Sequence, residues 1–181
     1  MLNVHRLFHG SKIYGPGTRD VIWFKGCTLR CKGCINPELW SKEPETLYSV
    51  ADLANALQSN EVTLLGGEPL QQEDILAFLI EIKKKGIGVI LFTGYELNDL
   101  QGDKLKAAKL CDCVISGPFD PAQKDDSLYL MGSRNQRINL FTDRYSEKDF
   151  QKPTSYEAIL GKGIELHGRS KTLVEEFLDI D

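Results

Sequence analysis

Short apolar runs alternate with helical patterns through most of the chain, and this alternation limits the possible folds more than any other feature of the sequence. The apolar runs that we interpret as buried strands are residues 21–24, 62–65, 89–92 and 113–115. Each interval between successive runs is long enough to hold a helix. Because a helix that crosses over between two strands leaves them parallel, the pattern predicts an α/β fold with a parallel sheet.

Helical periodicity marks these crossovers. Ser49 and Asp52 have the spacing of a capping box, which is typical of a helix start. The apolar stripes of the first two helices are Val50, Leu53, Ala54 and Leu57, and then Ile75, Phe78, Leu79 and Ile82. A third helix is expected around residues 97–110, weakened by Gly102 because glycine is a poor helix former.

The length of the chain limits how far a sheet of this kind can close. With 181 residues it has the size of one domain, residues 1–181, and is too short for a complete eight-fold barrel. We therefore expect an incomplete TIM-like barrel of parallel strands with crossover helices, and a core that covers about residues 15–141. Outside this core, an edge strand is expected at residues 2–9, and a β-hairpin with a short helix at about 154–180. The hairpin strands are residues 156–160 and 164–167, and the helix carries Leu173, Val174, Phe177 and Leu178.

Composition excludes several functional classes. Apolar residues make up 41% and charged residues 27% of the chain, as in ordinary globular proteins. The net charge is −4, and the basic run at residues 83–85 ends a helical pattern, so we expect no nucleic-acid partner. The apolar runs are too short for a signal peptide or a membrane span, so no membrane partner is expected. Three of the five cysteines share one loop, which fits a reducing compartment and predicts a cytoplasmic protein.

That loop contains Cys27, Cys31 and Cys34. Thiolates that lie side by side repel each other, and a shared metal removes this cost. Sulfur ligands suit zinc or an iron–sulfur cluster. No histidine or further cysteine stands close to the loop as a fourth ligand, whereas structural zinc sites usually close all four positions with protein groups. A cluster with one open position is thus favoured, and a zinc-braced binding module is the alternative.

A short polar or glycine-rich motif follows each of the four predicted strands. These motifs are the cysteine loop, Gly66 to Pro69, Thr93 to Tyr95 and Ser116 to Pro118. In parallel α/β folds, ligands bind at the carboxyl ends of the strands. We therefore expect the four motifs to meet at one edge of the sheet.

The motif at Gly66, Gly67 and Glu68 has two interpretations. Without β-carbons the glycines would let the backbone come close to a ligand and adopt positive φ, and Glu68 would accept hydrogen bonds from an ammonium group. The alternative is a plain turn that ends at Pro69. The role of Tyr95 also has two interpretations, because an aromatic residue at a strand end either stacks on an adenine ring or joins the core.

Other residues near these motifs have simpler expectations. Cys111 and Cys113 lie in an apolar strand and are expected in the core, since free cysteine is among the most buried residue types. Arg30 and Lys32 stand between the cysteines, where they either offset the charge of a thiolate-bound cluster or remain solvated.

The C-x-x-x-C-x-x-C spacing, followed by Gly66-Gly67-Glu68-Pro69 after an apolar run, resembles the radical S-adenosylmethionine (SAM) superfamily. The resemblance implies that the three cysteines of the loop hold a 4Fe-4S cluster whose fourth iron is chelated by SAM. It also implies contacts to SAM from Gly66, Gly67 and Glu68, with Thr93 and Tyr95 as further cofactor-binding residues.

A wider set of matches resembles the activating enzymes of glycyl-radical enzymes. These matches are Gly15-Pro16-Gly17-Thr18-Arg19, Trp23, Gly26-Cys27, Cys34-Ile35-Asn36-Pro37 and Trp40. Within that group the chain is most similar to the activating proteins of anaerobic ribonucleotide reductase. This further likeness includes Thr93-Gly94-Tyr95, Cys111-Asp112 and Gly132-Ser133-Arg134-Asn135-Gln136-Arg137, so it covers about residues 3–141.

The resemblance implies an enzyme that cleaves SAM reductively and generates a glycyl radical on a partner protein. The implied partners are the large subunit of anaerobic ribonucleotide reductase and a low-potential electron donor such as flavodoxin or ferredoxin. No catalytic side chain is expected beyond the cluster and SAM. The alternatives are a different glycyl-radical protein, a peptide or a small molecule as the substrate.

Two segments remain open at this stage. Residues 134–137 are expected to open a strand, which would place them away from the carboxyl-end site unless the preceding loop folds back over it. They serve either as a structural segment or as a partner contact. Residues 118–133 form a polar loop that is longer than most connections in a compact domain. We expect this loop to become ordered on contact with the partner.

Overall fold

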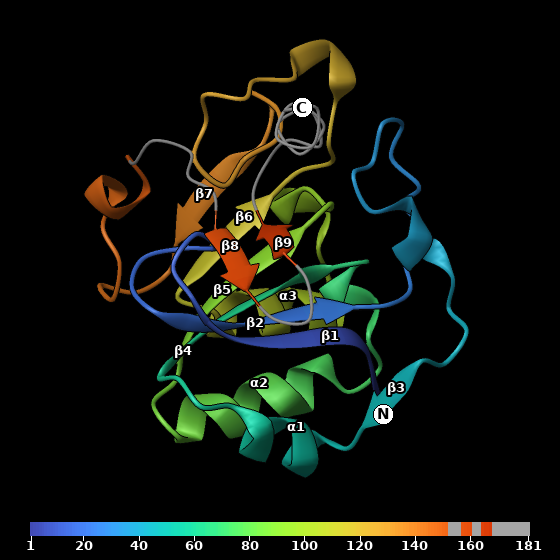
Figure 1. Ribbon diagram of the computed structural model, residues 1–181, viewed down its shortest axis with the longest axis vertical. Coiled ribbons are helices and arrows are strands. Elements are labelled where there is room, and N and C mark those ends of the chain that lie inside the picture. Colours follow the sequence, from blue (N-terminus) through green and yellow to red (C-terminus); the bar gives the residue numbers. More distant parts are fainter. Residues whose placement is uncertain (152–156, 161–163, 168–181) are drawn as a thin grey trace.

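The computed structural model describes residues 1–151, 157–160 and 164–167. They form a seven-stranded sheet with the order β3-β1-β2-β4-β5-β6-β7 and a separate two-stranded sheet, β8-β9 (Figure 1). The strands are β1 (Leu2–Ser11), β2 (Arg19–Phe24), β3 (Thr46–Tyr48), β4 (Glu61–Gly66), β5 (Gly88–Thr93), β6 (Cys113–Ser116), β7 (Arg137–Leu140), β8 (Glu157–Leu160) and β9 (Ile164–His167). The α-helices are α1 (Val50–Ala56), α2 (Ile75–Lys84) and α3 (Gly102–Leu110).

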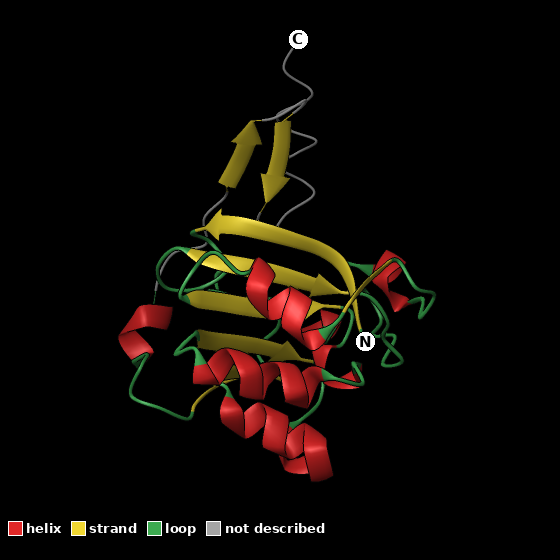
Figure 2. Cartoon of the chain, turned by 90° about the horizontal axis from the view of Figure 1, so that it is seen from below, coloured by secondary structure: helices red, strands yellow, loops and turns green. Residues whose placement is uncertain are grey.

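The centre of the large sheet is parallel, as the alternating pattern predicts. β2 pairs with β4, β4 with β5, and β5 with β6, all in parallel register. The crossover helices α1, α2 and α3 lie side by side on one face of the sheet (Figure 2). β1, β3 and β7 are antiparallel additions, so the sheet is mixed and, among the described residues, open at β3 and β7. The α/β class is confirmed, whereas the form of an incomplete barrel stays a prediction.

Both faces of the sheet are buried. The core beneath the helices includes Ile22, Phe24, Leu64, Leu91, Leu53, Phe78, Leu79, Ala107 and Cys111. The opposite face has a smaller core, in which Ile90, Cys113 and Ile115 pack against Tyr129, Tyr145 and Phe150 from the loops after β6 and β7. The predicted core positions of Cys111 and Cys113 are thus confirmed.

The helices form for the reasons that the sequence indicates. Ser49 Oγ accepts a hydrogen bond from the Asp52 amide at the start of α1, as expected of a capping box. All four residues of the α2 stripe are buried. In the part of the chain that the structure describes, no helix combines the length and the apolar character that crossing a membrane requires.

Three expectations need correction or completion. Residues 2–9 form a strand, but it is not an edge, because Leu2 to Val4 of β1 pair with β3. The third helix begins at Gly102; residues 97–99 form a separate 3-10 turn because Leu100 is extended and buried. The C-terminal hairpin is confirmed as β8 and β9, while the helix expected at 173–178 lies outside the described residues.

The carboxylate of Asp112 joins α2, β5 and the segment after β7 near the amino ends of β5 and β6. It accepts hydrogen bonds from Lys83 Nζ of α2 (2.7 Å), the Val89 amide of β5 (2.8 Å) and Thr142 Oγ1 beyond β7 (2.8 Å). Burial opposes the charge, but these three donors outweigh it and hold the pKa of Asp112 below its usual range. The charged carboxylate therefore contributes to the stability of the sheet.

Candidate functional site

The four predicted motifs lie at one edge of the sheet. β2 and β4 end in register at Phe24 and Gly66, and β5 and β6 end in register at Thr93 and Ser116. The chain after each of these strands therefore leaves the sheet on the same side. This arrangement was expected from the parallel order alone.

The segment 134–137 also lies at this edge, where it is expected only if the preceding loop folds back over the site. Because β7 runs antiparallel to β6, its first residue, Arg137, pairs with Ser116, the last residue of β6. Arg137 is exposed, and its guanidinium donates to the backbone oxygens of Arg134 (2.9 Å) and Gln136 (3.2 Å). Basic side chains are thus present beside the motifs.

The cysteine loop is closed at its base by two backbone hydrogen bonds. The amides of Gly26 and Cys27 donate to the carbonyl oxygens of Leu39 (2.8 Å) and Trp40 (3.2 Å). Within the loop, the Cys34 amide donates to the Cys31 carbonyl oxygen at 3.1 Å. The loop therefore has a defined path through the three cysteines.

The three thiols of the loop are the predicted ligands of a sulfur-bound cluster. Cys27 is buried, while Cys31 and Cys34 are half-buried, and all three are free. Burial raises the pKa of the Cys27 thiol, against hydrogen bonds from the Leu29 and Arg30 amides that favour the thiolate. Among the described residues, no three His, Cys, Asp or Glu side chains meet as a site for a single metal ion. A four-iron cluster does not require such a meeting point, since each thiolate would bind a different iron. Three free thiols on one loop are the type of donor that such a cluster takes, so the chemistry of these residues fits this group.

Gly66 and Gly67 allow two stretches of backbone to come together. The Gly67 amide donates to the Phe24 carbonyl oxygen (2.8 Å), and the Glu68 amide donates to the Gly26 carbonyl oxygen (2.9 Å). Gly66 has a φ of +109°, and a β-carbon at Gly67 would lie 2.5 Å from the Gly26 oxygen. The glycines thus join the turn after β4 to the entrance of the cysteine loop; close approach to a ligand stays a prediction.

Glu68 turns its side chain into the protein and is 1% exposed. Its carboxylate accepts hydrogen bonds from the Leu70 amide (3.0 Å), Thr93 Oγ1 (2.9 Å) and the Gly94 amide (2.8 Å). Burial raises the pKa of Glu68 to about 7, although these donors favour the charged form. Glu68 and Thr93 therefore contact each other, and the contacts of both residues to SAM stay predictions.

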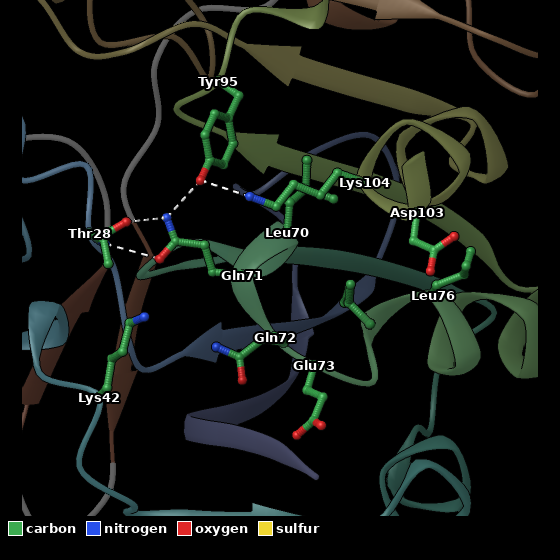
Figure 3. A pocket seen from close by; sticks show the side chains of 11 residues that line it. Thr28, Lys42, Leu70, Gln71, Gln72, Glu73, Leu76, Tyr95, Asp103 and Lys104 are labelled. Atoms are coloured by element: carbon green, nitrogen blue, oxygen red, sulfur yellow. Dashed lines mark hydrogen bonds between the residues drawn. The ribbon is translucent and has the colours of Figure 1, made fainter. Parts of the chain in front are cut away.

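Tyr95 is partly buried at the edge of the core and also lines a cavity. Its ring packs against the core beneath the helices, and its hydroxyl lies beside Gln71 and Lys104 at the cavity (Figure 3). The cavity has a volume of about 450 Å³ and reaches Thr28 in the cysteine loop. Stacking of Tyr95 on adenine stays a prediction. Gln71 was missed, because nothing in the sequence distinguishes it from a surface glutamine.

Residues 118–133 fold back toward the cysteine loop. A β-carbon at Gly33 would lie 3.2 Å from the Phe119 ring, so the two loops are in contact. Ser133 is fully buried and its hydroxyl accepts a hydrogen bond from the Asp120 amide at 3.1 Å. The amide of Arg134 donates to the Gln123 carbonyl oxygen at 2.9 Å. The loop is packed in this structure, and its ordering on contact with a partner stays a prediction.

Comparison with known families decides the class of the site. The family described as a 4Fe-4S single cluster domain matches residues 13–139. This chain belongs to that family. The expected iron–sulfur class is thereby confirmed, and the match contains the cysteine loop and the three motifs that follow the other parallel strands.

Several relatives carry the name anaerobic ribonucleoside-triphosphate reductase-activating protein. The protein of Escherichia coli (strain K12) is 30% identical over 151 residues, covering 76% of this chain and 98% of the relative. The protein of Pasteurella multocida (strain Pm70) is 32% identical over 160 residues, covering 78% and 99%. The protein of Enterobacteria phage T4 is 30% identical over 153 residues, covering 78% and 96%. The likeness thus spans nearly the whole of each relative, and the family match ends before β8 and β9.

Proposed function

We propose that this chain is an activating enzyme of an anaerobic ribonucleotide reductase and that it works with a 4Fe-4S cluster and SAM, as a member of the radical SAM superfamily. The observation that supports this most is the pair of backbone hydrogen bonds from Gly67 and Glu68 to Phe24 and Gly26. They hold the glycine-rich turn against the entrance of the cysteine loop. The relatives at 30–32% identity, all named for activation of this reductase, support the same function.

When bound, the cluster and SAM would supply the reductive cleavage of SAM that leads to removal of a hydrogen atom from a glycine of the reductase. In this proposal Cys27, Cys31 and Cys34 hold the cluster. Contacts to SAM come from the ends of β4 and β5, at Gly66, Gly67, Glu68, Thr93 and Tyr95.

The buried residues at this edge act by fixing positions. Glu68 is held by donors from its own turn and from the end of β5, so the two turns keep a constant separation. The half-buried Cys31 and Cys34 leave the cluster side of the loop partly accessible. A site of this kind is open to a protein substrate.

The partner in this proposal is the large subunit of the reductase, which brings a glycine-bearing segment to the open edge. A sheet that forms an incomplete barrel would leave room for that segment. Electrons come from a low-potential donor such as flavodoxin or ferredoxin, in the cytoplasm. Residues 118–133 contact the cysteine loop through Phe119, and we expect this segment to become ordered on contact with the partner.

Product analysis tests this function. The chain is reconstituted without oxygen with iron and sulfide, reduced and mixed with SAM, and 5'-deoxyadenosine is measured. We expect the parent to form it and Cys27→Ala, Cys31→Ala and Cys34→Ala to lose it. Cys113→Ala is the matched control, because this cysteine is buried in β6. Loop variants as active as the parent, or a protein that holds one zinc and no iron, would contradict the proposal.

A further inference from the structure

The Gln71 side chain lies between the cysteine loop and the end of β5 (Figure 3). Its Oε1 accepts a hydrogen bond from the Thr28 amide at 3.0 Å. Its Nε2 donates to Thr28 Oγ1 at 2.8 Å and to the Tyr95 hydroxyl at 2.9 Å. The backbone amide of Thr28 can only donate, so the oxygen of Gln71 must face it and the nitrogen must face the two hydroxyls. Both donor hydrogens of the amide are therefore used.

Lys104 of α3 supports this arrangement from the other side. Its ammonium group donates to the Tyr95 hydroxyl at 3.0 Å and lies 4.4 Å from the centre of the Tyr95 ring. The resulting chain of contacts runs from Lys104 through Tyr95 and Gln71 to Thr28. The Tyr95 hydroxyl oxygen accepts hydrogen bonds from both Lys104 and Gln71, so the two donors fix its position between them. Four segments of the fold are thus joined at the cavity.

Thr28 is the point at which this chain of contacts acts on the loop, since it directly follows Cys27. Between Cys27 and Cys31, a second contact comes from Leu29, whose Cδ1 would lie 2.5 Å from a β-carbon at Gly94. The arm from Cys27 to Cys31 is therefore held at one position by polar contacts and at the next by packing.

We propose that Gln71 is a positioning residue that sets the path of the arm from Cys27 to Cys31 and, through it, the surroundings of the cluster. This inference rests on the proposed function, because it assumes that these cysteines hold a cluster. It goes beyond that function by assigning a role to a residue outside the cysteine loop and the glycine-rich turn.

Gln72 provides a contrast one residue away. Its Oε1 accepts from the Asn3 amide (2.9 Å) and its Nε2 donates to the Lys25 carbonyl oxygen (2.9 Å), so it joins β1 to the chain before the loop. Substitution of either glutamine by leucine removes the same groups and weakens the fold. Only the Gln71 substitution releases the arm between the cysteines.

The experiment compares the parent, Gln71→Leu, Gln72→Leu and Gln71→Glu. Exchange of the Thr28 amide hydrogen is measured on the full chain before reconstitution. Iron release to a chelator and the electron paramagnetic resonance (EPR) spectrum of the reduced cluster are measured after it. For Gln71→Leu we expect amide exchange and iron release to be about three- to tenfold faster, since about 1 kcal/mol per hydrogen bond corresponds to such factors. We also expect a changed spectrum.

The other variants separate positioning from simple loss of stability. Gln72→Leu should keep the parental spectrum and iron-release rate. Gln71→Glu should restore both, because a carboxylate accepts hydrogen bonds from the Thr28 amide and from both hydroxyls. If the parent holds iron and Gln71→Leu has the parental spectrum and iron-release rate, this inference is overturned and the proposed function is unaffected. A parent that holds no iron overturns the proposed function, and with it this inference.

Discussion

The Thr93 hydroxyl donates a 2.9 Å hydrogen bond to Glu68 Oε1 and so joins the ends of β4 and β5 inside the protein. The Gly94 amide adds a second link to the other carboxylate oxygen at 2.8 Å. Because Glu68 is 1% exposed, the accessible part of its turn is the half-buried backbone at Gly66 and Gly67. The Glu68 side chain therefore fixes the positions of the ends of β4 and β5 relative to each other.

The buried carboxyl group of Glu68 makes the stability of the metal-free protein depend on pH. Burial raises its pKa from 4.5 to about 7, so the folded protein holds the proton more tightly than the unfolded chain. The free energy of unfolding should fall as the pH rises through this window and level off above it. Glutamine does not titrate, so the parent should lose about 2–4 kcal/mol relative to Glu68→Gln between about pH 5 and pH 8. Chemical denaturation measures the difference, and parallel pH profiles for the two proteins would refute this account.

Gly67→Ala should separate the glycine-rich turn from the cysteine loop. The added β-carbon would lie 2.5 Å from the Gly26 oxygen, and backbone on both sides must shift. We expect a loss of about 1–3 kcal/mol in unfolding free energy, as for other overpacked sites. Iron uptake in reconstitution should fall as well.

Gly86→Ala is the control for this substitution. Gly86 has a φ of +74° and no atom within 4 Å of an added β-carbon, so it carries backbone strain without a clash. Its loss of stability should be about 1 kcal/mol, with unchanged iron uptake. Equal iron uptake by both variants would show that the contact between Gly67 and Gly26 does not position the loop.

Asp112→Asn tests the hydrogen bonds that join α2, β5 and the segment after β7. The substitution removes the charge that Lys83 contacts and disturbs the hydrogen bonds from Val89 and Thr142. We expect a loss of about 1–3 kcal/mol in the free energy of unfolding at neutral pH. Asp103→Asn, which breaks an exposed pair with Lys106, should cost no more than about 0.5 kcal/mol. A similar small effect for both variants in urea denaturation would show that Asp112 does not fasten the strands.

The parallel centre of the fold follows from local patterns. Apolar stripes such as Ile75 to Ile82 require a buried helix face, and a helix between two strands makes them parallel. The meeting of the motifs at one edge then needs no further information. The direction of β7 could also have been predicted. Residues 118–133 have no helical periodicity, and a chain without a crossover helix returns as an antiparallel strand.

The details of the site depend on side chains that are distant in sequence. The partner of Glu68 is Thr93, and the partner of Gln71 is Thr28; only the register of the strands brings them together. Periodicity describes which face of an element is buried and carries no information on such pairs. β3 was missed for a simpler reason, since its three residues are too few to show alternation.

Activation of the reductase itself is the most direct test of the central claim. The reconstituted and reduced chain is mixed with SAM and the large subunit of an anaerobic ribonucleotide reductase, and the mixture is examined by EPR. We predict a glycyl-radical doublet on the reductase that requires SAM and is absent with the Cys31→Ala variant. Turnover of a peptide or a small molecule without any radical on the reductase would contradict the account.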